Sequence, residues 1–127
     1  MKVGDELPEV SGESNLVASV MYAAASGDYN PLHYDKSFAE HVSPTKDIIA
    51  HGMMSMGLAS RALTGWAGGC EKVASIDVRL TKPWPIGTKS TFGGTVTDVD
   101  DEVVTVELWG RNENGDTILK GLGVVRR

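Results

Sequence analysis

The sequence has a single cysteine and no long apolar run. Cys70 has no second cysteine to pair with, so an intrachain disulfide is excluded and a thiolate metal cluster is unfavourable. We expect Cys70 to be a small packed residue. No stretch approaches the roughly 18 apolar residues that a membrane-spanning helix needs. We therefore expect a protein that stays out of the membrane and acts in the cytoplasm.

The sequence also has fewer basic than acidic residues. The 12 lysines and arginines are outnumbered by 17 acidic residues, which leaves a formal net charge of −5. Domains that bind nucleic acid generally need a basic face, so this balance argues against such a role. A negative net charge still allows a local basic patch on the surface. The cations that could form one, or that could equally be scattered over the surface, are Lys36, Lys46, Lys72, Arg79, Lys82 and Lys89.

The remaining composition is that of one ordinary domain. With 127 residues, 41% hydrophobic and 23% charged, the chain can bury a core of normal size, so we expect a single domain over residues 1–127. We find no internal repeat and no linker.

The first half of the chain has helical spacing. Residues 2–10 read as an extended lead, and Ser14 or Asn15 can cap a helix that runs to about residue 26. A short helix is expected over 35–41. Apolar residues continue almost all the way round a longer helix at 52–66, which predicts that this helix is buried.

The second half changes to a period of two. Ile76, Val78 and Leu80 alternate with polar residues, as in a strand with one buried face. Further strands are expected over 88–99, 102–110 and 117–125, with a type I′ hairpin turn at Asn114 and Gly115. One helix followed by a long antiparallel sheet predicts an α+β domain that encloses the helix.

The densest chemistry lies in the segment 26–35, SGDYNPLHYD. Gly27 can end the preceding helix in a left-handed conformation, and Pro31 stiffens the chain and disfavours helix at the residue before it. Asp28, Asn30 and His33 therefore sit on one rigid loop. A carboxylate, an amide and an imidazole can together hold a water molecule and move its proton near neutral pH.

Residues 27–35 match the pattern G-D-x-N-P-x-H-x-D in full, and Ile49-Ala50-His51-Gly52-Met53 follows. With these motifs the chain resembles the MaoC-like, or R-specific enoyl-CoA hydratase (hydratase 2), family, and related 3-hydroxyacyl-thioester dehydratase subunits. The resemblance covers nearly the whole chain. It implies a hot-dog fold, in which a curved antiparallel sheet wraps around a long central helix.

The same resemblance implies an activity. Family members add water reversibly to trans-2-enoyl thioesters, giving R-3-hydroxyacyl thioesters, and need no cofactor beyond the coenzyme A or acyl carrier protein that is part of the substrate. It also implies a homodimer, or a heteromer with another hot-dog chain, with the site at the subunit boundary. A basic patch, if formed, would then hold the coenzyme A phosphates or the acidic surface of a carrier protein.

Roles for single residues follow from the matched motif. Asp28 and His33 would form the catalytic dyad, and Asn30 would help to position them. Gly52 begins the long helix, where a free backbone amide and the helix dipole suit a developing anion on the thioester oxygen. His51 would contact the substrate or order the helix entry.

The other polar residues have plainer interpretations. We expect Asp35 to cap the short helix and His41 to lie on the surface. No HxH, HExxH or compact carboxylate set is present, so we expect no metal site. Two other functions stay open. One is thioester hydrolysis, for which Asp28 would direct water at the carbonyl, and the other is a subunit that supports a catalytic partner.

Overall fold

The computed structural model describes residues 1–127. The first half contains the short strand β1 (Val10–Glu13) and the helical elements α1 (Leu16–Ser26), η1 (Pro31–His33), α2 (Lys36–Val42) and α3 (Gly52–Ala67). After the single 3₁₀ turn η2 (Cys70–Lys72), the chain forms the strands β2 (Val73–Leu80), β3 (Lys89–Val99), β4 (Val103–Asn112) and β5 (Thr117–Arg126). The helices precede the main strands, as predicted, but only β3, β4 and β5 form a meander, because β2 pairs with β5 and not with β3.

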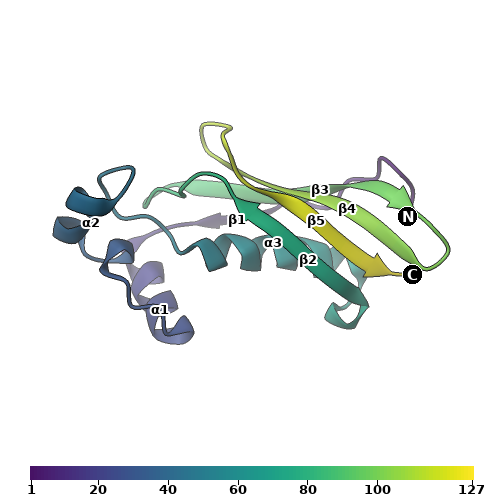
Figure 1. Cartoon of the computed structure of the whole chain (residues 1–127), viewed down its shortest axis with the longest axis horizontal. Coiled ribbons are helices and arrows are strands. Elements are labelled where there is room, and N and C mark those ends of the chain that lie inside the picture. The colour runs from purple at the N-terminus through teal and green to yellow at the C-terminus, as the bar shows by residue number, and fades with distance from the viewer.

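The strands make one antiparallel five-stranded sheet in the order β1-β3-β4-β5-β2. The sheet curls over α3, while α1 and α2 lie at one end of it, away from both termini (Figure 1). This is the hot-dog architecture that the motifs implied. No helix of the structure is long and apolar enough to cross a bilayer.

The core lies between α3 and the concave face of the sheet. Ala59 and Leu63 of α3 are fully buried there against Phe92 and other sheet residues. Burying a leucine side chain stabilises the fold by about 1.5–3 kcal/mol. The absence of a side chain at Gly123 leaves room for Leu63 to pack against β5, because a Cβ at Gly123 would lie only 2.6 Å from Leu63 Cδ2. The close approach of α3 to the sheet fixes where the start of this helix lies.

Two of the expectations about burial are wrong. Helix α3 is buried on one face only, and Met53 on its other face is 62% exposed, because a single curved sheet covers only one side of the helix. Cys70 is also exposed rather than packed. It lies in η2, just after the left-handed Gly68 and Gly69 carry the chain away from α3 and out of the core.

The strand β1 was not expected, and one turn differs from its prediction. Val10–Glu13 reads VSGE, which has little strand character, but its pairing with the start of β3 makes it the fifth strand. Gly115 has a φ of 81°, whereas no positive φ occurs at Asn114, so the hairpin is not type I′. Asn112 instead closes the turn, since its side chain accepts hydrogen bonds from the amides of Asn114 and Asp116.

Candidate active site

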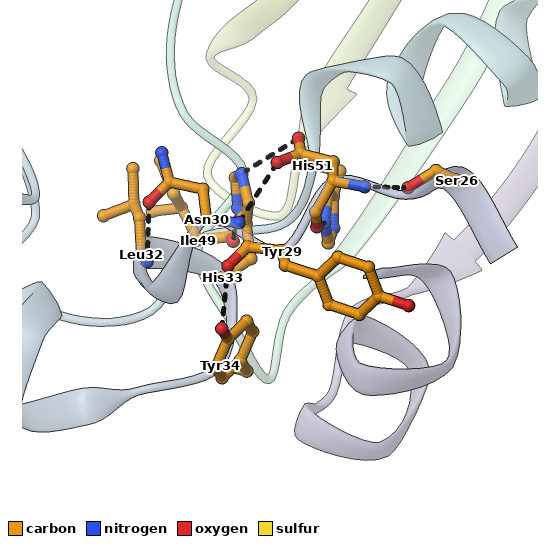
Figure 2. A network of polar contacts seen from close by, with 9 residues as sticks. Ser26, Tyr29, Asn30, Leu32, His33, Tyr34, Ile49 and His51 are labelled. Carbon is orange, nitrogen blue, oxygen red and sulfur yellow. Dashed lines mark hydrogen bonds and ion pairs between the residues drawn. The ribbon is translucent and has the colours of Figure 1, made fainter. Parts of the chain in front are cut away.

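The loop between α1 and α2 is held by its own polar groups. Gly27 ends α1 with a φ of 77°, as predicted. Asp28 Oδ1 then accepts a hydrogen bond from the Asn30 amide at 3.2 Å, and Asn30 Oδ1 accepts one from the Leu32 amide at 3.1 Å. The Tyr34 hydroxyl donates to the Tyr29 carbonyl at 2.7 Å. These bonds fix the loop in one shape (Figure 2).

His33 is the buried member of this loop, at 8% exposure. Its Nδ1 lies 2.8 Å from the carbonyl oxygen of Ile49. A carbonyl can only accept, so Nδ1 carries the hydrogen, and in the neutral imidazole the lone pair is on Nε2. That Nε2 faces Asp28 Oδ2 at 3.8 Å. The carboxylate itself is about half exposed, so one oxygen holds the loop while the other is open to a water or a substrate.

His51 is buried next to His33 and does not line the pocket described below. It is 1% exposed, and its ring stacks on that of His33 with centroids 3.9 Å apart and an interplanar angle of 25°. Its Nε2 donates to the backbone carbonyl of Asp28 at 3.1 Å, and Tyr22 packs on it at a tilted 4.7 Å. Its Nδ1 is buried without a partner. The His51 ring thus contacts both the backbone of Asp28 and the ring of His33.

Asp28, His33 and His51 each place a potential ligand atom within 4.8 Å of the others. The arrangement suits a metal ion poorly. An ion must lie in the plane of each imidazole that binds it, and two rings stacked nearly parallel cannot both direct a lone pair at one point. Nδ1 of His33 and Nε2 of His51 are also engaged with backbone carbonyl groups.

A pocket of about 370 Å³ opens beside His33. One wall comes from His33, the approach to α3 and its first turn, and the other from the end of β2 and the loop after it. The lining residues are His33, Pro44, Ile49, Ala50, Gly52, Ser55, Leu80, Thr81, Lys82, Pro83 and Trp84.

The start of α3 is open toward this pocket. His51 is the N-cap residue, and no side chain caps the first amides of the helix. Gly52, the first helical residue, lines the pocket, so its amide has no intrahelical partner and lies beside the space. The methyl group of an alanine at Gly52 would come against Leu80 Cδ1, so the Leu80 side chain on the pocket wall would have to move.

Of the predicted site residues, only His33 and Gly52 line the pocket. Asp28, His33 and His51 are brought together. Asn30 does not line the pocket, and its side-chain oxygen is used within the loop. Asp35 caps α2 and His41 is exposed, both as expected.

Other lining residues were not found from the sequence. Leu80, Thr81 and Trp84 have no motif, and only the register of β2 and the path of the chain after it bring them to the pocket. Ser55 could have been noticed, because it lies three residues after Gly52 and so on the same face of α3. Of the six cations considered above, only Lys82 lines the pocket, and its Nζ is 3.5 Å from Asp116 Oδ1.

Comparison with known proteins agrees with this geometry. Residues 10–113 match the MaoC-like domain. The chain is 36% identical to the beta subunit of 3-oxo-4,17-pregnadiene-20-carboxyl-CoA hydratase from Mycobacterium tuberculosis, over 91% of this chain and 89% of that subunit.

Solved structures agree as well. The (R)-hydratase of A. caviae superposes with a TM-score of 0.89 and 26% identity, covering 98% of this chain and 96% of that one. The ChsH1-ChsH2 complex of M. tuberculosis matches with a TM-score of 0.85 and 34% identity, over 100% and 99% of the chains. These likenesses confirm the hot-dog fold and the resemblance noted in the sequence. The chain belongs to the MaoC-like dehydratase family, and it is a hydro-lyase of the enoyl-thioester hydratase type.

Proposed function

We propose that the chain hydrates trans-2-enoyl thioesters reversibly to R-3-hydroxyacyl thioesters of coenzyme A or acyl carrier protein, with Asp28 and His33 as the catalytic dyad. The observation that carries this proposal is the position of His33 Nε2. It is the free nitrogen of a fixed ring, it faces Asp28 Oδ2, and its residue lines the pocket that also contains the open start of α3.

The 3.8 Å between His33 Nε2 and Asp28 Oδ2 is too long for a direct hydrogen bond. One water molecule can contact both atoms. In hydration the dyad takes one proton from this water as its oxygen bonds to the β-carbon, and one proton is returned to the α-carbon. Elimination uses the same groups in the opposite protonation states. Each such transfer contributes on the order of 10²–10⁴ in rate.

Attack at the β-carbon moves negative charge onto the thioester oxygen. Gly52 supplies the group to receive it, because its amide begins an uncapped helix and lines the same pocket as His33. A fixed donor at the positive end of a helix stabilises such charge without having to reorganise.

His51 and Asn30 act through the dyad in this proposal. The stack with His51 keeps the His33 ring from rotating, and the bond from His51 Nε2 holds the backbone of Asp28. Asn30 accepts the Leu32 amide and so holds the turn that carries His33. We therefore infer that His51 is a positioning residue and not a substrate contact.

We further propose that the working unit contains a second hot-dog chain. Strand β2 is at the edge of the sheet, so one row of its backbone groups is free to pair. Leu80, at the end of β2, lines the pocket while 48% exposed. The related hydratase chain is a beta subunit, and the ChsH1-ChsH2 structure is a complex of two different chains. Size-exclusion chromatography of the chain alone and with a candidate partner chain separates a homodimer from a heteromer.

The direct test of the activity is the loss of the enoyl-thioester ultraviolet absorbance on mixing the purified chain with crotonyl-CoA, then with a longer enoyl-CoA. Rapid loss without release of free thiol supports the hydratase. Release of thiol with the double bond intact would contradict it and indicate a thioesterase. No loss with either substrate, repeated with the partner chain and with enoyl groups on acyl carrier protein, would also contradict it.

A further inference from the structure

The polar side chains Thr81 and Lys82 line the pocket but are paired with Thr117 and Asp116, whereas the hydroxyl of Ser55 has neither a partner in the protein nor a role in the proposed reaction. Its residue is 4% exposed and lines the pocket. Thr64, further along α3, returns its hydroxyl to the backbone carbonyl of Arg61. Ser55 makes no bond of this kind and has no hydrogen-bond partner in the protein. The hydroxyl is not sealed inside the protein, as Ser90 Oγ is, so it can pair with a ligand that enters the pocket.

The position of Ser55 on α3 tells which ligand atom it can reach. Side chains of an α-helix tilt toward its N-terminus, and residues three apart share a face. Ser55 therefore lies one turn after Gly52, on the same side of the helix, and points back toward the open first turn. Both residues line the same pocket. Its hydroxyl and the Gly52 amide can thus approach one acceptor from the same helix.

We propose that Ser55 is a further catalytic residue, whose hydroxyl donates a hydrogen bond to the thioester oxygen alongside the amide of Gly52. This rests on the proposed hydratase function. The reacting oxygen of a thioester is a weak acceptor before the attack and an enolate-like anion during it. A second fixed donor would therefore act more strongly on the transition state than on the bound substrate.

The first test is Ser55→Ala, which removes only the hydroxyl. We expect kcat for hydration of crotonyl-CoA to fall on the order of 10²–10³-fold, as for the loss of one oxyanion donor, with a smaller change in KM. Ser90→Ala is the matched control, because Ser90 likewise has a hydroxyl without a partner in the protein but lies outside the pocket. It should leave both constants unchanged. A Ser55→Ala variant that keeps the wild-type kcat would overturn the proposal.

A second measurement separates this role from simple pocket shape and does not need turnover. Butyryl-CoA has the thioester carbonyl, and the thioether S-butyl-CoA lacks it. Calorimetry should show that Ser55→Ala raises Kd for butyryl-CoA by about 2- to 10-fold and leaves that for S-butyl-CoA unchanged. Equal weakening of both ligands would refute the contact with the oxygen. If the wild-type protein hydrates no enoyl thioester, the proposed function fails, and this ligand pair still decides on Ser55.

Discussion

The helices α2 and α3 both begin after an extended residue but differ in how their first turns are capped. At α2, Asp35 Oδ1 accepts hydrogen bonds from the Ser37 amide, the Ser37 hydroxyl and the Phe38 amide. At α3 no side chain caps the helix, and the first turn borders the pocket. The amides of Ser37 and Phe38 thus contribute to the stability of α2, whereas the amide of Gly52 at the start of α3 has no intrahelical partner.

The two carboxylates of the loop follow the same division. Asp35 uses its oxygen on the helix cap, whereas Asp28 keeps Oδ2 turned toward His33. The two carboxylates thus differ in what is left for a ligand: Asp35 Oδ1 is used within the fold, and Asp28 Oδ2 has no hydrogen-bond donor from the protein. We expect Asp35 to matter for stability and Asp28 for activity.

The largest effect on activity is expected at His33, whose Nε2 has no hydrogen-bond partner in the protein. We expect His33→Ala to lower kcat for hydration on the order of 10²–10⁴-fold, because the free Nε2 is lost. Adding Asp28→Asn to this variant should cost little more, since groups that work as a unit are not additive. Steady-state kinetics of the two single variants and the double variant measure this. Fully additive losses would show that the two residues do not act on one water.

A moderate effect is expected at the first residue of α3. Gly52→Ala puts a methyl group against Leu80 at the pocket wall, and we expect activity to fall on the order of 10- to 10²-fold through misplacement of the substrate. Gly57→Ala is the control on the same helix, because no atom lies within 4 Å of its new Cβ. It should keep activity and raise the free energy of unfolding by about 0.4–1 kcal/mol. Equal activity of both variants would remove Gly52 from the site.

A smaller effect, on stability and not on activity, is expected at an N-cap residue that does not line the pocket. Asn15 Oδ1 accepts a hydrogen bond from the Ala18 amide at the start of α1. Asn15→Ala should lower the free energy of unfolding by about 1 kcal/mol and leave kcat unchanged. Urea denaturation and the enoyl-thioester assay on the same preparation test both parts. A loss of activity at unchanged stability would contradict the purely structural role of Asn15.

The smallest expected effect is on the pH dependence of folding stability. The hydrogen bond from the Ser37 hydroxyl, and then that from the Phe38 amide, hold the pKa of Asp35 below its ordinary value of 3.8. A pKa that is lower in the folded state adds stability above the unfolded pKa, and this part is lost as pH falls through the folded pKa. Asp35→Asn should therefore flatten the acid side of the stability profile, as measured by thermal unfolding from about pH 5 to about pH 2. A profile as steep as that of the wild-type protein would contradict this.

Much of the fold could be predicted because its signals are local. Gly27, Asn15 and Asp35 end or begin helices through bonds to residues a few positions away. The alternation in β2 correctly predicted a strand with Ile76 and Val78 toward the core, but the expectation that Leu80 is buried with them is wrong, because Leu80 is 48% exposed at the end of this edge strand. The burial of α3 and of Cys70 was misjudged because exposure depends on how far one sheet reaches. The strand β1 forms only because β3 offers it an edge.

The candidate site shows the same limit. Asp28, Asn30 and His33 share one rigid loop, so their spacing along the chain was enough to group them. The place of His51 behind His33 depends on how the start of α3 meets the loop, which no local pattern encodes. The far wall at Leu80 and Trp84 depends on the register of β2 and on the loop that follows it.

The most direct test of the central claim compares the two carboxylates of the loop. The measurement is kcat/KM for hydration of crotonyl-CoA, or of the thioester that the wild-type protein prefers, by Asp28→Asn and by Asp35→Asn. We predict a loss on the order of 10²–10⁴-fold for Asp28→Asn and wild-type activity for Asp35→Asn. Near-normal hydration by Asp28→Asn, or equal losses in the two variants, would contradict the assignment of Asp28 and His33 as the dyad.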